Sequence, residues 1–349
     1  MYRTMRHTLA TAVVVGLALS GCATADARVG DTTGTPPAVQ PGDEPAATGV
    51  TTVVAVSVDG LNPAAIRKLG PQGAPTLHRL IEEGASTLNA RTEREQTETL
   101  PNHTGMLTGR RITAASGGHG VTWNDERLEP RTVQQAVGHP VSSVFSVVDS
   151  PARDTALFAS KQKFSLFERS WDEAIDRFVI RENNDVLTRK VRRDIADKAR
   201  SFRFVHYSWP DTEGHEHRFM SRAYLDAVQD VDRWLGRIVA KLEAQDSLDG
   251  RVTVIVTADH GGRGPGHIDP TMLSSYRVPF IVWGAGVEAG ADLYDLNPDY
   301  ADPGRKRTKY AAAKQPVRNG DVANLVTDLL GLGTVPDSEH NADQDLDVR

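Results

Sequence analysis

The chain has 349 residues, a formal net charge of −6 and an ordinary hydrophobic fraction of 39%. The length allows one large domain or two smaller ones, and the mild acidity argues against a protein that coats a nucleic-acid polymer, which would be basic. The single cysteine excludes an internal disulfide bond.

The first 22 residues have the pattern of a secretion signal. Arg3 and Arg6 precede the apolar run Leu9–Leu19, which is shorter than an ordinary membrane-spanning helix. The run leads into Ser20-Gly21-Cys22 and resembles the bacterial lipoprotein box, in which the cysteine is lipidated and becomes the mature N-terminus. We expect residues 1–22 to be a lipoprotein-type signal peptide, and several acyl chains on the cysteine would hold an extracytoplasmic protein stably on a membrane. Plain secretion and a retained N-terminal anchor are the alternatives.

Residues 23–49 are rich in Thr, Gly, Pro, Ala and Asp and contain almost no large apolar side chain. Such a segment cannot bury enough surface to offset the entropy of ordering it. We expect a disordered linker between the membrane anchor and the folded part of the chain.

From residue 50 onward, strand patterns alternate with helix patterns. Apolar and β-branched runs predict strands at 50–58, 141–148, 154–158, 202–209, 252–257 and 278–283. Helical spacing and helix-start residues predict helices at 75–84, 180–201, 221–247 and 321–332. This alternation indicates a single α/β layered domain over residues 50–345. Residues 335–349 have the composition of an acidic, mobile end, and 346–349 are expected to be a tail.

Thr99 stands directly before a predicted helix. Pro101 suits the first turn of a helix, where its missing N–H group costs nothing. A helix N-terminus favours an anion, so the Thr99 hydroxyl could face a phosphate there. An alcohol is a weak nucleophile at neutral pH, and a base or a metal ion must activate it.

Three aspartates, Asp59, Asp211 and Asp259, fall just after predicted strands. Ligands of open α/β sheets gather at the carboxyl ends of the strands, so these side chains are expected to converge. Taken singly, each has an ordinary alternative as a turn residue.

Histidines stand close to two of these aspartates. His215 follows Asp211 by four positions, His260 adjoins Asp259, and His267 comes after a glycine-rich loop. Aspartate and histidine together suit zinc. With the Thr99 oxygen, the set is large enough for two metal ions, which can activate a nucleophile and stabilise a leaving oxygen.

These motifs resemble those of the nucleotide pyrophosphatase/phosphodiesterase branch of the alkaline phosphatase superfamily. The resemblance covers most of residues 50–345 and departs from the eukaryotic branch in one place, where a short glycine-rich loop replaces a large insert before the last histidine. The matching segments are Asp59, Thr99-Leu100-Pro101-Asn102-His103, His119-Gly120-Val121-Thr122-Trp123-Asn124, Pro210-Asp211-Thr212-Glu213-Gly214-His215, Asp259-His260-Gly261 and His267.

The resemblance implies a mostly parallel central sheet between helices, and two zinc ions. It implies that one ion is held by Asp211, His215 and His267. The other would be held by Asp59, Asp259, His260 and Thr99. Thr99 would be the nucleophile that forms a phospho-threonine intermediate, and Asn124 would contact the phosphate.

The expected function is hydrolysis of a small-molecule phosphodiester or nucleotide pyrophosphate. A phosphomonoesterase or phosphonate hydrolase with the same metals is the enzymatic alternative, and a non-catalytic partner-binding lipoprotein is the other. Lys161 and Lys163 could hold a second anionic group of the substrate or form a solvated turn. Trp123 and Trp209 could stack on a substrate or fill core. His206, within a strand, is expected to be a packed side chain.

Overall fold

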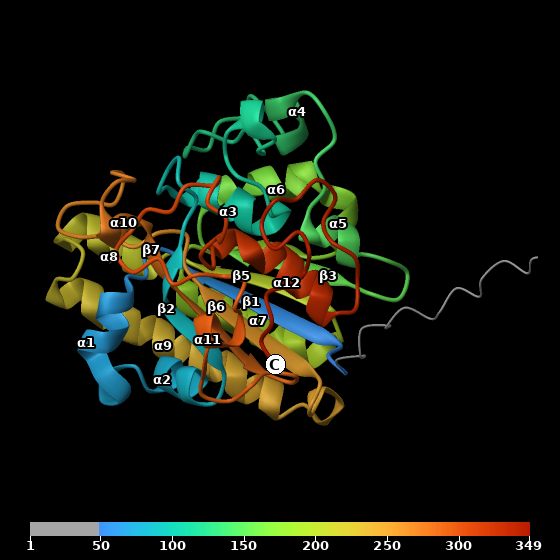
Figure 1. The fold of residues 1–349 in the computed structure, drawn as a ribbon. Helices are drawn as coiled ribbons and strands as arrows, with labels where there is room; N and C mark the ends of the chain where they lie inside the picture. The colour runs from blue at the N-terminus through green and yellow to red at the C-terminus, as the bar shows by residue number, and fades with distance from the viewer. Residues whose placement is uncertain (1–48) are drawn as a thin grey trace, which may run out of the picture. The chain divides into compact units, whose positions relative to one another are not determined.

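A computed structural model describes residues 49–349, so the predicted signal peptide and all but the last residue of the predicted linker lie outside the described residues. An eight-stranded sheet forms the centre of the domain, in the order β4-β3-β5-β1-β6-β7-β2-β8 (Figure 1). All strands run parallel except β7, which is antiparallel to both of its neighbours. The strands are β1 (Thr52–Val58), β2 (Ala85–Arg91), β3 (Thr155–Ala159), β4 (Phe178–Ile180), β5 (Phe202–Tyr207), β6 (Val252–Thr257), β7 (Arg277–Gly284) and β8 (Ala291–Asp292).

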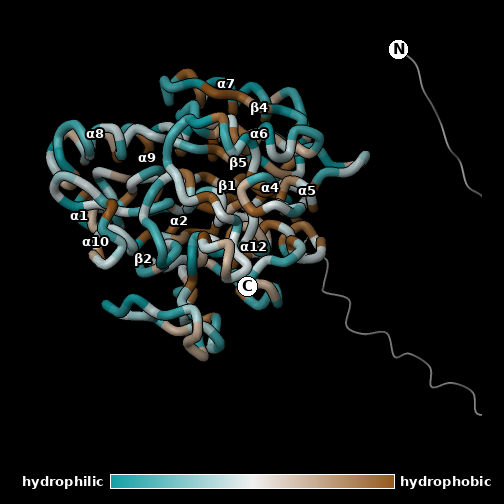
Figure 2. The backbone as a smooth tube through the Cα atoms, turned by 90° about the horizontal axis from the view of Figure 1, so that it is seen from above, coloured by the Kyte–Doolittle hydropathy of each residue, from teal (hydrophilic) through white to brown (hydrophobic). Residues whose placement is uncertain are grey.

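The central strands β1, β5 and β6 are buried along their whole length. Parallel strands covered on both faces are near-continuous apolar runs, which is the pattern that predicted them. Figure 2 shows hydrophobic segments around β1 and β5 and polar segments at the periphery. The predicted α/β fold with a mostly parallel central sheet is therefore confirmed.

Helices cover both faces of the sheet. The helix α9 packs against α1, α2, α7 and α8, while α12 packs with α3 and α5 (Figure 1). The first set comprises α1 (Pro63–Gly73), α2 (Pro75–Glu82), α7 (Asn184–Asp197), α8 (Trp209–His217) and α9 (Arg222–Glu243). The second comprises α3 (Thr99–Thr108), α5 (Val144–Val148) and α12 (Val322–Leu329), and shorter helices are α4 (Val133–Val137), α6 (Ser165–Ser170), α10 (Leu273–Tyr276) and α11 (Leu293–Leu296).

The longest helix, α9, shows how the sequence pattern produces this layering. The Ser221 hydroxyl caps its start by accepting a hydrogen bond from the Tyr224 amide. Its apolar residues recur at helical spacing and are buried, so one face of the helix packs inward. They include Leu225, Val228, Val231, Leu235, Ile238 and Leu242.

Two segments differ from the expectations. Residues 141–148, predicted as a strand, contain the helix α5, because Ser143 and Ser146 form a reciprocal capping box that starts a helix. The chain end, expected to be mobile, packs on the domain: Leu346 and Val348 are buried, and the Val348 carbonyl accepts a hydrogen bond of 2.8 Å from the Glu288 amide. Over residues 49–349, no helix has both the length and the apolar character that crossing a bilayer requires.

Candidate metal centre

Four charged side chains lie at the carboxyl ends of four adjacent parallel strands. Lys161 follows β3, Asp211 follows β5, Asp59 directly follows β1, and Asp259 follows β6. Because these strand ends meet at one edge of the sheet, residues far apart in the sequence face each other there. Gly60 permits the close approach: its φ of +73° is left-handed, and a Cβ atom would lie 3.2 Å from the Asp211 Cα atom.

The predicted aspartates and histidines form two overlapping groups of possible metal ligands. One contains Asp211, His260 and His267, the other Asp59, Asp259 and His260, and the ligand atoms of each group lie within 4.8 Å of one another. His260 Nε2 lies 3.3 Å from Asp59 Oδ1, 3.3 Å from Asp259 Oδ2 and 3.8 Å from Asp211 Oδ1.

His215 joins the first group from the helix α8. Its Nε2 atom lies 3.0 Å from His267 Nε2 and 3.3 Å from Asp211 Oδ1. Its neighbour His217 instead contacts Glu213 and Glu216, in a separate and more exposed group. The structure thus brings all six predicted Asp and His ligands together.

The atoms that face one another in this cluster have no other partner. Asp59 Oδ1, Asp211 Oδ1, Asp259 Oδ2 and His260 Nε2 are buried and form no hydrogen bond within the described chain. Buried charges are normally paired or coordinate a metal ion. Carboxylate oxygens and imidazole nitrogens are suitable ligands for a divalent cation such as zinc, so the residues present fit a metal centre.

Backbone carbonyl groups orient two of the imidazole rings. The Nδ1 atom of His260 donates a hydrogen bond of 2.8 Å to the Gly261 carbonyl, and that of His267 donates one of 2.6 Å to the Thr97 carbonyl. With the proton on Nδ1, the Nε2 lone pair of each ring is directed at the cluster, as a metal ligand requires.

Crowding of like charges perturbs the cluster strongly. Burial raises the pKa of Asp259, and the nearby Asp59 carboxylate raises it further, to about 8. Burial disfavours the charged form of His260, but the carboxylates around it, Asp259 first, raise its pKa to about 9. Burial and the charge of His260 lower the pKa of His267 to about 3. A bound cation would compete with the protons that the raised pKa values place on Asp259 and His260.

Thr99 is the first residue of α3 and is almost completely buried. Its hydroxyl lies 3.4 Å from the ammonium group of Lys161. The Leu100 amide, in the same helix turn, donates a hydrogen bond of 3.0 Å to Asn124 Oδ1. Lys163 also donates to this oxygen, at 3.1 Å. Both contacts use Asn124 Oδ1 as the acceptor, so neither uses the side-chain amide nitrogen of Asn124 as a donor. Thr99, the predicted nucleophile, and Asn124, the residue predicted to contact the phosphate, are therefore neighbours.

Lys161 is not the solvated turn residue that was one of its two predicted roles. Its Nζ atom lies 2.6 Å from Asp59 Oδ2 and 2.7 Å from Asp211 Oδ2. Burial lowers its pKa, but these two carboxylates outweigh that effect, so the pKa lies above its ordinary value. Lys161 is an internal cation that joins one carboxylate from each ligand group.

Sequence reasoning missed the contact that His206 makes. This residue is packed in β5, as expected, but its Nε2 atom also lies 2.9 Å from Asp59 Oδ2. His103 supports the same region, because its Nε2 atom lies 2.8 Å from the Ser57 hydroxyl and its Nδ1 atom donates to the Thr99 carbonyl at 2.7 Å. The strand register gives the one indication of this contact: β1 pairs in parallel with β5 so that His206 lies beside Ser57, two residues before Asp59.

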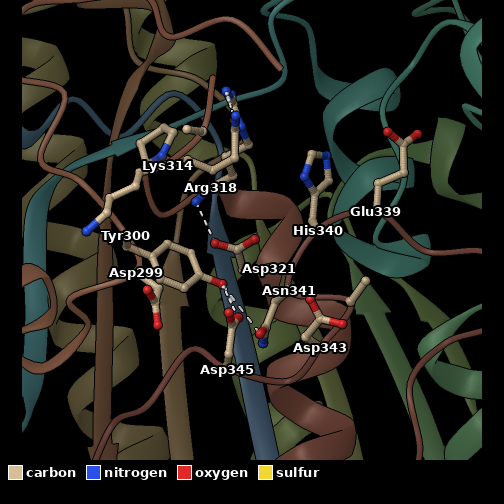
Figure 3. Close-up of a pocket in the computed structure, with 14 residues that line it drawn as sticks. Asp299, Tyr300, Lys314, Arg318, Asp321, Glu339, His340, Asn341, Asp343 and Asp345 are labelled. Carbon is tan, nitrogen blue, oxygen red and sulfur yellow. Dashed lines mark hydrogen bonds between the residues drawn. The ribbon is translucent and has the colours of Figure 1, made fainter. Parts of the chain in front are cut away.

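A separate cavity of about 420 Å³ lies near the chain end (Figure 3). Tyr300 donates to Asp345 there at 3.0 Å, and Figure 3 shows these side chains beside Asn341. Its acids, including Asp321 and Asp343, belong to none of the possible metal-ligand groups found among residues 49–349. This cavity is therefore distinct from the candidate metal centre.

The fold and the cluster define an α/β protein with a candidate metal centre at the carboxyl edge of its parallel strands. The profile of the type I phosphodiesterase / nucleotide pyrophosphatase family matches residues 53–264, which include every predicted metal ligand except His267. The chain belongs to this family, as its motifs indicated.

Curated relatives and solved structures support this assignment. The chain is 28% identical over 290 residues to GPI ethanolamine phosphate transferase 1 of Neurospora crassa, covering 74% of this chain and 27% of that protein. It is 26% identical over 301 residues to the enzyme of the same name from Mus musculus, covering 78% and 30%. The chain thus spans less than a third of the length of these relatives.

Two solved structures show the same fold. Murine ectonucleotide pyrophosphatase / phosphodiesterase 5, in an inactive threonine-to-alanine form in complex with AMP, has a TM-score of 0.62 at 15% identity, covering 85% of this chain and 99% of that one. Ps i-CgsB in complex with k-i-k-neocarrahexaose has a TM-score of 0.55 at 14% identity, covering 85% and 74%.

Proposed function

We propose that this protein is a metal-dependent phosphodiesterase in which Thr99 is the nucleophile. The observation that carries the proposal is the set of unpartnered, buried ligand atoms of Asp59, Asp211, Asp259 and His260 beside the start of α3. The inactive threonine-to-alanine form of the structural neighbour supports a threonine in this role.

Two zinc ions fit the ligand set. Asp211, His215 and His267 would hold one ion, and the other would be held by Asp59, Asp259, His260 and the Thr99 oxygen. Bound divalent cations lower the pKa of a coordinated hydroxyl group and neutralise charge on the phosphoryl group.

The remaining residues position the reaction. The Thr99 hydroxyl loses its proton and its oxygen forms a bond to phosphorus while the bond from phosphorus to the leaving oxygen breaks, and the leaving oxygen takes up one proton in exchange. The Asn124 amide donates to a phosphoryl oxygen, as the donors of an oxyanion hole do. Water then attacks phosphorus, the bond from phosphorus to the Thr99 oxygen breaks, and a proton from that water regenerates the Thr99 hydroxyl group. Lys161, 3.4 Å from the Thr99 hydroxyl, stabilises negative charge at that oxygen.

Transfer to an alcohol is a second candidate activity. The curated relatives are named as ethanolamine phosphate transferases, and the same phospho-threonine could pass its group to an alcohol instead of water. The alternative of a monoesterase is less well supported, because Lys161 already pairs with two carboxylates instead of offering a free cation to a second substrate charge.

Hydrolysis of bis-p-nitrophenyl phosphate tests the proposal. Purified protein should release p-nitrophenol, a chelator should abolish the release, and added zinc should restore it. Thr99→Ala should lower turnover by about 10⁴-fold or more, whereas Thr113→Ala, at an exposed threonine, should not. Activity that survives the chelator or the Thr99 substitution would refute the mechanism.

A further inference from the structure

Residues 303–318, which we call the basic segment, concentrate positive charge in a chain whose net charge is −6. The segment contains six Lys and Arg residues and no Asp or Glu. These residues are Arg305, Lys306, Arg307, Lys309, Lys314 and Arg318. Over residues 49–349, none of the six forms an ion pair with a carboxylate, although most other arginines near acids do. The protein therefore leaves this charge without a partner of opposite sign.

Most of these cations face solvent. Arg305, Lys306, Lys309 and Lys314 are exposed. An open cavity of about 470 Å³ lies among Lys306, Arg307, Lys309 and Lys314, with small alanine side chains between them. Its one acid, Asp302, accepts a hydrogen bond from Asn89. The basic segment thus presents a surface of accessible positive charge.

The sheet topology places the basic segment at the edge that carries the candidate metal centre. The strand β2 is parallel to β1 and β6, so Arg91, its last residue, lies at the carboxyl edge. The Arg91 guanidinium donates to the Gly304 carbonyl at 2.9 Å and to the Lys306 carbonyl at 3.3 Å. The Tyr310 hydroxyl donates at 2.6 Å to Glu95, in the segment that leads to Thr99. The exposed cations and the metal centre therefore share one edge of the sheet.

The distribution of these cations favours an extended anionic partner. A single bound anion is held by donors that converge on it. The cations of the basic segment instead spread along an exposed stretch of chain, which suits a surface of many negative charges. A bilayer with anionic lipids has such a surface, and its negative potential attracts clusters of Lys and Arg within about 10 Å. A lipid anchor at Cys22, as expected from the sequence, would keep the domain near a bilayer.

We propose that the basic segment docks on a bilayer surface rich in anionic lipid and turns the metal-centre edge of the domain toward that surface. The cavity among the cations admits lipid headgroups between them. The inference goes beyond the proposed function, because it does not depend on which bond is cleaved.

Vesicle binding by the full-length chain tests the docking. Cys22→Ala is used as the parent, so that no acyl chain contributes. Its partition is measured by sedimentation with vesicles of phosphatidylcholine alone and of equimolar phosphatidylcholine and phosphatidylglycerol. Anionic vesicles should bind it more tightly, and added salt should reduce the difference. Lys306→Gln with Lys309→Gln should weaken binding to the anionic vesicles by about 30-fold, which is about fivefold for each charge, and leave binding to neutral vesicles unchanged.

An equal loss of charge elsewhere is the matched control. Arg192 and Arg193 are exposed on α7 and have no carboxylate partner among the ion pairs of the described chain. Arg192→Gln with Arg193→Gln should change binding to anionic vesicles by less than about twofold. Equal binding of the parent to both kinds of vesicle, or equal losses in the two double variants, would overturn the docking surface. Hydrolysis of bis-p-nitrophenyl phosphate should be the same in both double variants, so failure of the docking surface and failure of the proposed function are distinguishable.

A fluorescent label identifies the face that meets the bilayer. Ala311 is exposed within the basic segment, and Ala244 is exposed at the end of α9, shortly before β6 begins at the opposite edge of the sheet. An environment-sensitive fluorophore is attached to Ala311→Cys or to Ala244→Cys in the Cys22→Ala parent. Anionic vesicles should shift the emission to the blue only from position 311. A shift from position 244 instead, or from neither position when the protein is bound, would show that another face meets the bilayer.

Discussion

The ammonium group of Lys161 lies 2.6 Å from Asp59 Oδ2, while Asp59 Oδ1 is buried without a hydrogen-bond partner. One carboxylate thus divides its two oxygens between an internal cation and the candidate metal centre. Asp211 does the same, with Oδ2 on Lys161 and Oδ1 unpartnered. Lys161 therefore holds the two carboxylates in place without using the atoms that a metal ion needs.

Removal of this cation should destabilise the metal-free protein. Lys161→Met leaves two buried carboxylates without their partner, which should lower the free energy of unfolding by about 3–5 kcal/mol. Thermal unfolding after chelation measures the loss, and added zinc should recover more stability in the variant than in the wild type. Lys163→Met is the control, because Lys163 has no carboxylate partner among the ion pairs of the described chain. Equal losses for both variants would contradict the bridging role.

A buried pair of Glu93 and His340 should make stability depend on pH. Their side chains are 2.9 Å apart. Burial opposes both charges, but His340, Arg318 and Tyr310 lower the pKa of Glu93 below its ordinary 4.5, while Glu93 and Asp321 raise that of His340 above 6.5. The contribution of charged His340 to the free energy of unfolding is therefore complete below pH 6.5 and disappears as the pH rises through the raised pKa of His340. The glutamate contribution is complete above pH 4.5 and disappears as the pH falls.

The stability lost in His340→Gln should therefore be largest between about pH 5 and 6.5 and smaller at about pH 9. Urea unfolding of wild type and variant at each pH measures the difference. Burial raises the pKa of Asp321 to about 7 and the charge of His340 opposes that rise, so the difference between wild type and variant includes this coupling as well as the pair with Glu93. His139→Gln, at an exposed histidine, should show no such profile. A His340→Gln loss that is the same at every pH would rule out the charged pair.

Cys22, outside the described residues, is the residue on which the expected lipid anchor depends. If the cysteine is lipidated, Cys22→Ala should move the protein from the membrane to the soluble fraction. Cell fractionation with immunodetection measures this, and incorporation of a labelled fatty acid into the wild type but not the variant checks the modification. Wild-type protein that is already in the soluble fraction would remove the basis for a lipid anchor.

The sheet and the ligand cluster were predictable because the signals are local. Buried strands such as β1 and β6 are continuous apolar runs, and an aspartate at the end of each marks the same edge of a parallel sheet. That rule predicts from the sequence that Asp59, Asp211 and Asp259 converge.

The contacts of Lys161 and His206 with Asp59 were not predictable in this way. They join residues 102 and 147 positions apart, and each depends on strand order and side-chain direction. A lysine after a strand or a histidine within one has no local pattern that reveals a buried carboxylate partner. The helix α5 was missed for a related reason, since its β-branched residues favour a strand and only the Ser143 cap favours a helix.

The end of the chain, residues 335–349, was expected from its composition to be mobile but packs on the domain, and this packing can be tested. Composition made residues 335–349 resemble a loose acidic end, yet Leu346 is buried and its amide donates to Asn341 Oδ1 at 3.0 Å. Leu346→Ala should lower the free energy of unfolding by about 2–5 kcal/mol. Chemical denaturation measures it, with Asp343→Ala at an exposed neighbour as the control. A loss of only a few tenths of a kcal/mol would mean that the end does not stabilise the domain.

His206 should tune metal binding although it is not a ligand. Its Nε2 atom contacts Asp59 Oδ2 at 2.9 Å and its ring packs 4.2 Å from that of Phe164, so His206→Phe removes the contact while keeping an aromatic ring. Partners of this kind contribute about 10–100-fold to metal affinity.

Competition with a chromogenic chelator should therefore show weaker zinc binding in His206→Phe, but a smaller loss than in Asp59→Asn, because Lys161 still holds the carboxylate. His139→Phe, at an exposed site, is the matched control. Circular dichroism confirms that each variant is folded. Unchanged zinc affinity in folded His206→Phe would show that this histidine only packs, whereas a loss equal to that of Asp59→Asn would mean that it is needed as much as a ligand.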